Sequence, residues 1–193
     1  MRIVDCRYAM ASLARLHAGI RRCTACPLAS SRRHAVPGAG PASARAMLIG
    51  EAPGRKEDEL GLPFVGPSGR FLDELLATIG RTRDEFYITS SVKCRPPQNR
   101  QPRPGELETC KDLWLTKQIA LIRPRLIVCL GRVSAHSFVG SVDLRTQHGT
   151  IIRKDRQAYF ITYHPAAGMR FPKVREVMIA DFSVLNRILQ MKE

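Results

Sequence analysis

Five consecutive apolar residues, Leu126–Leu130, are the feature that most restricts how this sequence can fold. Pro124 precedes the run and Gly131 follows it, so the segment has the length of a strand. A strand without polar alternation is typical of a parallel sheet that is covered on both faces. The run therefore predicts an α/β fold, in which helices pack on both sides of a mostly parallel sheet.

The rest of the chain alternates between strand and helix patterns. Further strands are predicted at 46–49, 86–89, 150–152 and 158–162. Helical patterns lie near the N-terminus, before Gly80, between Pro104 and Pro124, after Gly131, and from Pro172 onward. The charged stretch up to Gly66 and the Pro-rich stretch 95–104 are predicted to be loops.

Three chemically distinctive segments directly follow predicted strands. They are the turn Gly-Glu-Ala-Pro-Gly at 50–54, the region of Ser90, and the segment that begins with His164. In a parallel sheet, ligands bind outside the carboxyl ends of the strands. We therefore expect the three segments to meet at one edge of the sheet.

The 193 residues have the usual length of a single domain, and 44% of them are hydrophobic, which is enough to form one core. We therefore expect one domain over residues 1–193. No apolar stretch approaches the roughly 18 residues of a membrane-spanning helix, so we expect a soluble, cytoplasmic protein that contacts no membrane. The Arg-rich start, residues 1–22, suits an amphipathic first helix better than a transit peptide.

The charge of the chain points to a polyanionic partner. Lys and Arg number 31 against 17 Asp and Glu, which gives a formal net charge of +14. Such an excess favours nucleic acid as the partner. A basic surface kept for solubility, or attraction to anionic lipid, would produce the same imbalance.

Four of the six cysteines have the pattern of a metal site. Cys23 and Cys26 form a CxxC turn, and Cys94 and Cys110 flank the Pro-rich loop. Four thiolates suit a [4Fe–4S] cluster or a zinc site, whereas the CxxC alone would equally suit a redox dithiol. Cys129 lies inside the apolar run and is predicted to be a core residue.

Together these motifs resemble the family 4 uracil-DNA glycosylases, the iron–sulfur type, from about Cys23 to the C-terminus. The resemblance is carried by the order and spacing of the four cysteines and of five segments: Gly-Glu-Ala-Pro-Gly at 50–54, Glu57-Asp58, Pro-Phe-Val-Gly at 63–66, Lys-Cys-Arg-Pro-Pro at 93–97, and His-Pro-Ala-Ala at 164–167.

The resemblance implies a three-layer α/β/α sandwich with a central, mostly parallel four-stranded sheet. It implies a structural [4Fe–4S] cluster on the four cysteines Cys23, Cys26, Cys94 and Cys110. The implied activity is DNA repair: the enzyme flips uracil out of DNA, hydrolyses its N-glycosidic bond and leaves an abasic site. The expected protein is a monomer associated with a prokaryotic nucleoid, and a sliding clamp is left open as a further partner.

The resemblance also implies two catalytic residues. Breaking the C1′–N1 bond leaves a cationic sugar and an anionic uracil. His164 would hydrogen-bond uracil O2, where negative charge develops. Glu51 would stabilise the sugar, orient the attacking water, or do both, since Ala52 stands where better-known uracil glycosylases carry a water-activating Asp. The alternative interpretations are that Glu51 is a structural carboxylate of the loop and that His164 is a capped or buried structural histidine.

Other positions are implied to bind substrate. Phe64 would stack on the flipped base, Gly50 would let the backbone approach it closely, and Ala52 is a further substrate-binding position in the same turn. Met169 would fill the gap left by the base, and Arg170 would contact a phosphate.

Ser90 departs from the family pattern. Family members carry Asn there, whose amide reads the uracil edge, so a glycosylase with a broader range of deaminated bases is an alternative. A non-catalytic iron–sulfur protein that binds nucleic acid, or an electron-transfer protein, would also explain part of the pattern.

Overall fold

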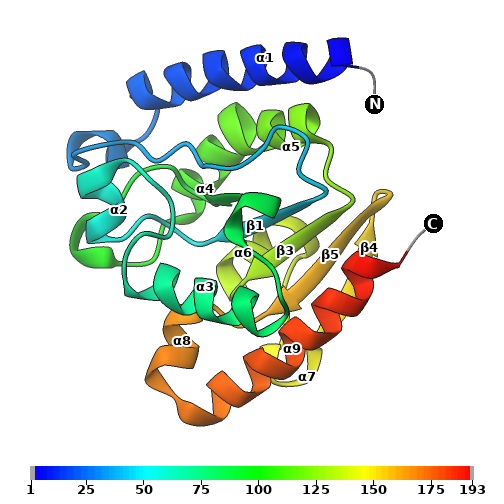
Figure 1. The fold of residues 1–193 in the computed structure, drawn as a ribbon. Helices are drawn as coiled ribbons and strands as arrows, with labels where there is room; N and C mark the ends of the chain where they lie inside the picture. Colours follow the sequence, from blue (N-terminus) through cyan, green and yellow to red (C-terminus); the bar gives the residue numbers. More distant parts are fainter. Residues whose placement is uncertain (1–2, 192–193) are drawn as a thin grey trace.

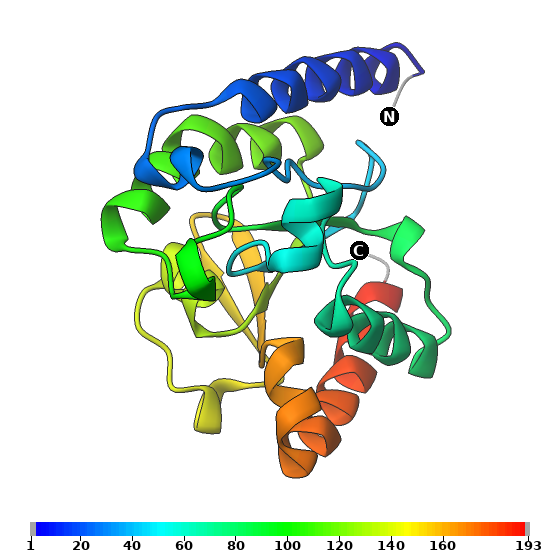
Figure 2. The same cartoon turned by 90° about the vertical axis from the view of Figure 1, so that its left-hand side faces the viewer.

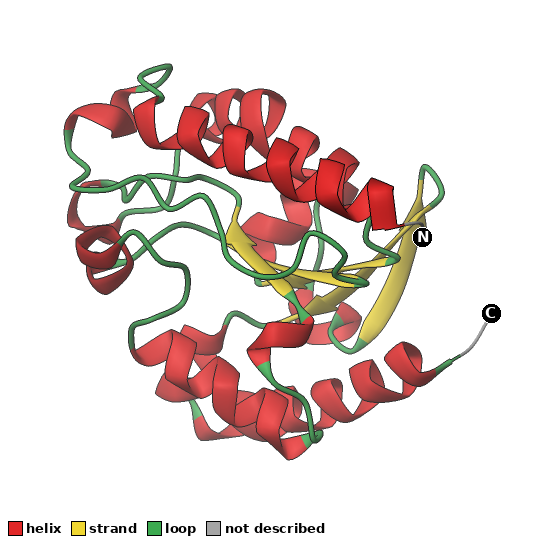
Figure 3. Ribbon diagram, turned by 45° about the horizontal axis from the view of Figure 1, so that its top comes forward, coloured by secondary structure: helices red, strands yellow, loops and turns green. Residues whose placement is uncertain are grey.

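The computed structural model describes residues 3–191, with side chains from residue 9 onward, and it forms three layers around a central sheet (Figures 1 and 3). Strands β2, β1, β3 and β5 run parallel in that order, and β4 pairs antiparallel with β5 at the edge. In sheet order, the strands are β2 (Tyr87–Ser90), β1 (Ala46–Gly50), β3 (Leu126–Leu130), β5 (Gln157–Thr162) and β4 (Thr150–Lys154).

The sheet thus has five strands, at the five segments that the residue pattern predicted, and only the four-stranded count implied by the resemblance was wrong. The antiparallel strand β4 forms a hairpin with β5. Asp155 and Arg156 form a two-residue turn with φ of 49° and 64°, and this left-handed turn matches the twist of an antiparallel pair. The fully buried pattern of β3 agrees with the prediction of a mostly parallel sheet covered on both faces.

Helices cover both faces of the sheet (Figures 1 and 2). On one face α3 and α9 pack over apolar side chains such as Leu48 and Val128, and α8 packs against these two helices. On the other face α1, α5 and α6 pack over Met47 and Ile127. The helices are α1 (Ile3–Arg22), α2 (Arg55–Leu60), α3 (Pro67–Thr78), α4 (Pro104–Cys110), α5 (Thr116–Ile122), α6 (Arg132–Val139), α7 (Leu144–Gln147), α8 (Pro165–Arg170) and α9 (Pro172–Gln190).

Two predicted segments differ in detail. The charged stretch before Gly66 was predicted to be a loop, but it contains α2, whose last turn ends at Gly61 with φ of 70°. Six residues are too few for a helical period to show in the sequence. The predicted helix from Pro104 is interrupted by a π-helical turn, Lys111–Leu115, which separates α4 from α5. Among the described residues, no helix has the length and apolar character needed to cross a bilayer.

Candidate active site and cysteine cavity

A cleft with a volume of about 820 Å³ opens at the carboxyl ends of the parallel strands. Gly50 and Ser90 end neighbouring strands and are paired in register, and His164 follows the end of β5. The structure brings most predicted site residues together here: the cleft is lined by Glu51, Ala52, Phe64, Ser90 and His164. This volume lies within the usual range for small-molecule pockets.

Gly50, at the end of β1, lies directly against two residues that line the cleft, Phe64 and His164. A Cβ atom at this position would lie 2.6 Å from Cζ of Phe64 and 3.6 Å from Nε2 of His164. No real Cβ contact is as short as the first distance, so a side chain here would displace the Phe64 ring. Glycine is therefore required if the aromatic ring and the histidine are to lie against the end of β1.

Phe64 is held in a strained conformation. Its φ is 51°, a left-handed value that few side chains other than glycine adopt easily, and its ring lies 5.9 Å from the His164 ring. Arg83 donates a 2.8 Å hydrogen bond to the Phe64 carbonyl, and Gly69 leaves room for that carbonyl. Strain of this kind is characteristic of functional sites.

Glu57 ties the two turns of the cleft together. Its carboxylate accepts hydrogen bonds from the backbone N–H groups of Gly54, Val65 and Gly66, at 3.1, 2.9 and 2.7 Å. Gly54 belongs to the turn after β1, and the other two residues follow Phe64. The charge of Glu57 thus fixes the position of the Phe64 loop relative to the sheet edge.

His164 caps the N-terminus of α8. Its Nδ1 accepts a 3.2 Å hydrogen bond from the backbone N–H of Ala166, so the proton of the neutral ring lies on Nε2. Burial lowers the pKa of His164 to about 4, against a small opposing effect of Glu57. The ring is therefore neutral at physiological pH and has Nε2–H available as a donor near Gly50.

Glu51 and Ser90 lie on the sheet side of the cleft. Burial raises the pKa of the Glu51 carboxyl above its usual 4.5, and the charge of Arg132 partly opposes the shift. Ser91 ties the two strand ends together, since its hydroxyl donates a 2.9 Å hydrogen bond to the Gly50 carbonyl. Ser90 is 4% exposed, so its hydroxyl is a buried polar group at the cleft wall.

A second, smaller cavity contains all four predicted metal ligands. It is lined by Cys23, Cys26, Cys94 and Cys110, together with Ile20, Ala29, Arg32, Lys93, Thr109 and Trp114. The four thiols are free. Burial raises the pKa of Cys110 to about 11 and also raises that of Cys94. The structure thus joins the CxxC turn to the two ends of the Pro-rich loop, as the spacing suggested.

Two side chains donate hydrogen bonds to the sulfurs of this cavity. Arg32 Nη1 lies 3.0 Å from Cys94 Sγ, and Trp114 Nε1 lies 3.2 Å from Cys23 Sγ. Such donors stabilise thiolates and metal-bound sulfur. In the part of the chain that the structure describes, no three Cys, His, Asp or Glu side chains are arranged to hold a metal ion. The prediction for Cys129 is confirmed, because it is fully buried in β3.

A family model described as the uracil DNA glycosylase superfamily matches residues 37–186. The chain belongs to this superfamily. The matched segment contains the whole sheet and every residue described above as lining the cleft.

Several relatives within the superfamily cover nearly the whole chain. The type-4 uracil-DNA glycosylase of Archaeoglobus fulgidus is 40% identical over 185 residues, 90% of this chain and 92% of the relative. That of Pyrobaculum aerophilum is 42% identical over 181 residues, covering 89% and 92%. That of Saccharolobus solfataricus is 39% identical over 183 residues, covering 90% and 84%.

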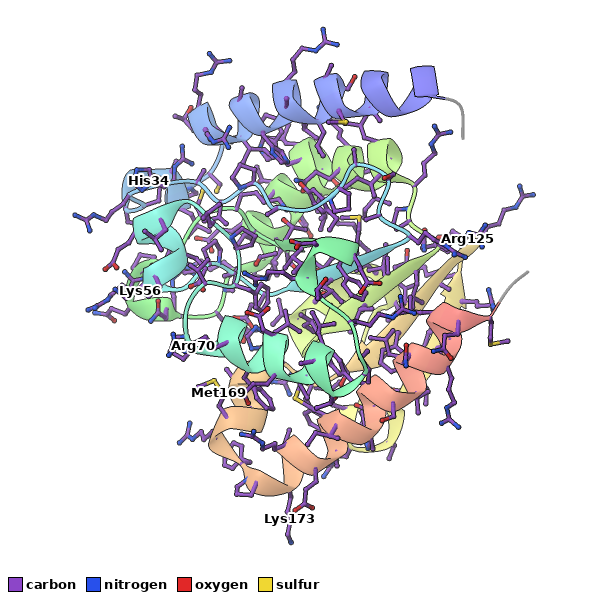
Figure 4. All side chains as sticks on the ribbon, viewed as in Figure 1. His34, Lys56, Arg70, Arg125, Met169 and Lys173 are labelled. Atoms are coloured by element: carbon purple, nitrogen blue, oxygen red, sulfur yellow. The ribbon has the colours of Figure 1, made fainter. Side chains whose placement is uncertain are left out.

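Met169 and Arg170 lie outside the residues that line the cleft of this superfamily member. Both are exposed on α8, the helix that begins after His164, and Met169 is 47% exposed (Figure 4). The Arg170 guanidinium lies 5.4 Å from the centre of the Phe171 ring. Lys56 and Arg70 line the cleft, and Figure 4 shows their side chains pointing outward on the same side as Met169.

The sequence alone gave no role to Glu57 or Arg83 in this superfamily member. Their contacts depend on the left-handed conformation of Phe64, which sequence patterns do not reveal for a residue other than glycine. The one available signal for Glu57 was its position between two glycine-containing turns, Gly54 and Gly66.

Proposed function

We propose that this chain is a uracil-DNA glycosylase that removes uracil from DNA and leaves an abasic site. The observation that carries the proposal is the position of His164, whose Nδ1 accepts a backbone hydrogen bond and so leaves Nε2–H as a donor. This donor lies in a cleft that also contains Phe64 and the half-buried carboxyl group of Glu51. A neutral donor stabilises an anionic leaving group without first losing its proton to it. The family and its type-4 relatives point to the same reaction.

The reaction requires a base that has left the helical stack. The flipped uracil enters the cleft and stacks on Phe64, which replaces part of the lost base stacking. As the C1′–N1 bond breaks, its electron pair leaves with uracil, and His164 Nε2–H donates a hydrogen bond to O2. The half-buried Glu51 carboxylate stabilises the cationic sugar and takes the proton of the attacking water, whose oxygen bonds to C1′.

Ser90 sets the range of bases in this proposal. Uracil offers N3–H as a donor and O4 as an acceptor, and one serine hydroxyl cannot pair squarely with both. Ser90 ends β2 at the cleft wall, where it pairs with Gly50 of β1, and Ala52 on the turn after β1 also lines the cleft. A glycosylase with a broader range of deaminated bases is therefore the alternative within the same chemistry.

The DNA backbone would lie across the outer rim of the cleft. Lys56 and Arg70 extend outward at this rim, Met169 is exposed beside it, and Arg170 follows on the same helix. Met169 would occupy the gap left by the flipped base, while the cations contact phosphates. The formal charge of +14 supports a polyanionic substrate.

Cys23, Cys26, Cys94 and Cys110 would hold a [4Fe–4S] cluster. Around one zinc ion, with Zn–S bonds of about 2.3 Å, four sulfurs lie only about 3.8 Å apart. In a four-iron core each thiolate binds a different iron, so the four sulfurs would lie farther apart than around one zinc ion. The N–H donors of Arg32 and Trp114 would hydrogen-bond these sulfurs. The bound cluster would cross-link α1, the Pro-rich loop and α4, and the excision step makes no use of it.

The wider assignments follow from this proposal. Residues 1–193 would form one glycosylase domain that acts as a monomer on the nucleoid in the cytoplasm of a prokaryote. A sliding clamp remains an untested partner.

One assay decides between an enzyme and a DNA-binding protein. The purified protein is incubated with an oligonucleotide that contains a single uracil, and alkali then cleaves any abasic site. Cleavage at the uracil is expected. Binding without cleavage would instead indicate a non-catalytic nucleic-acid-binding protein.

Metal analysis tests the cluster in the same preparation. A thiolate-bound cluster should give about four irons per chain and a broad absorption at roughly 400 nm. One zinc and no iron would indicate a four-cysteine zinc site.

A further inference from the structure

A buried lysine lies between the two sites described above. Lys93 is only 1% exposed, although its ammonium is the kind of group that proteins keep at the surface. Its Nζ donates a 2.7 Å hydrogen bond to the hydroxyl of Thr89 and another of 2.7 Å to the carbonyl of Ser90. Because the Thr89 hydroxyl donates in turn to the Pro37 carbonyl, at 2.8 Å, it has a lone pair free for Lys93.

One side of Lys93 therefore supports the base cleft. Ser90 is the last residue of β2, where it pairs with Gly50, and it lines the cleft wall. The bond from Lys93 fixes the Ser90 carbonyl, and with it the peptide plane from which the Ser90 side chain projects. A change at Lys93 would move the group that faces the base without removing any residue that touches it.

The other side of Lys93 faces the cysteines. The residue lines their cavity and directly precedes Cys94 in the chain. None of the carboxylates in the described part of the chain forms an ion pair with it. A buried cation needs a counter-charge, because transfer of an unpaired ammonium from water is costly. Four thiolates on a [4Fe–4S] core carry net negative charge and supply one.

We propose that Lys93 is a positioning residue that couples the metal cluster to the base cleft. The cluster neutralises the buried ammonium, and the ammonium holds the Ser90 carbonyl at the cleft wall. This inference rests on the proposed function. It gives the cluster a task in a hydrolytic reaction that transfers no electrons: it is the counter-ion of a lysine that shapes the substrate site.

The test uses the iron-loaded protein and three variants. Lys93→Met removes the charge and the donors, and Lys93→Gln removes the charge but keeps an N–H donor. The matched control is Lys154→Met, which removes an exposed lysine from the β4–β5 hairpin, where Nζ donates to the Phe138 carbonyl. Each protein is assayed for iron content, cluster reduction potential, and single-turnover excision as a function of enzyme concentration.

Loss of an adjacent cation disfavours the addition of an electron, so both Lys93 variants should have a more negative cluster potential than wild type. Lys93→Met should also require a roughly tenfold higher concentration for half-maximal excision, the usual effect of losing a charged hydrogen bond. The maximal rate should change less, since Glu51 and His164 are untouched. Lys93→Gln should keep more of the base affinity, and Lys154→Met should match wild type.

An unchanged potential in iron-loaded Lys93→Met, or in Lys93→Gln if the Met variant does not fold, would overturn the link to the cluster. A shifted potential with unchanged half-maximal concentration would overturn the link to the cleft. Wild-type protein without iron or without excision would instead count against the proposed function, and this is measured before the variants.

Discussion

The cleft and the cysteine cavity are joined by the segment 90–94, and they differ in size and in the polarity of their walls. The cleft is open and bounded by turns in which Gly50 and a strained Phe64 bring polar groups to its surface. The cavity is small, and its sulfurs lie among Ile20 and Leu28 in an apolar cluster. Access to a polymeric substrate requires the first arrangement, whereas exclusion of water from thiolates requires the second.

The two regions share one short segment. Ser90 ends β2 in the wall of the cleft, and Cys94, four residues later, reaches the cavity. Variants on either side of this segment should therefore separate the chemistry of the cleft from the integrity of the cavity.

Cys110→Ser should have the largest effect. Cys110 ends α4 and packs in the apolar cluster around the cavity, so loss of its thiolate should reduce iron from about four per chain to near zero. The midpoint of guanidinium unfolding should fall with it. The matched control is Cys129→Ala, a buried thiol outside the cavity, which should keep its iron. Full iron content in Cys110→Ser would remove that residue from the ligand set.

His164→Ala should lower the single-turnover rate by roughly 10²–10³, the usual loss for one donor to a developing oxyanion. Iron content and DNA affinity should not change, because the ring lies in the cleft and not in the cavity. His136→Ala, which removes an exposed histidine on α6, is the control. Wild-type turnover in His164→Ala would leave His164 only its role as the cap of α8.

Ser90→Asn should raise uracil excision relative to hypoxanthine excision by about 5- to 150-fold, which corresponds to roughly 1–3 kcal/mol of discrimination. The asparagine amide can donate to O4 and accept from N3–H at once. Ser68→Asn, at the rim of the same cleft, should leave the ratio unchanged. A ratio that does not rise would show that the pocket selects bases by shape.

The pH dependence of the excision rate should reflect the protonation of Glu51. Burial raises the pKa of Glu51 above 4.5, whereas that of His164 is lowered to about 4. The excision rate should therefore fall about tenfold per pH unit below the Glu51 pKa, as the carboxylate is protonated. Glu51→Gln should be slow and should lack this acid limb. A limb near pH 6.5 that disappears in His164→Ala would assign the titration to the histidine instead.

The sequence predicted those parts of the fold and the cleft that follow from a single structural rule. An uninterrupted apolar run predicted the central strand, and the placement of ligands at strand ends predicted that Glu51, Ser90 and His164 would meet. The edge strand β4 was also predicted from its residues, at 150–152, but its antiparallel pairing depends on a two-residue left-handed turn at Asp155 and Arg156.

The support of the cleft could not be predicted in the same way. The carboxylate of Glu57 collects three N–H groups from two turns that meet only after the chain has folded. The outward position of Met169 likewise depends on α8, a helix too short to leave a period in the sequence.

Gly168 has a mechanical consequence for the cleft. A Cβ atom there would lie 2.5 Å from the Phe71 ring and 2.9 Å from the Met178 sulfur, so α8 is seated on α3 with no intervening side chain. Helix α3 begins three residues after Phe64, and α8 begins directly after His164. The two helices that follow Phe64 and His164 thus pack directly against each other. A movement of either helix would therefore press on the other, and this packing holds the Phe64 and His164 rings 5.9 Å apart.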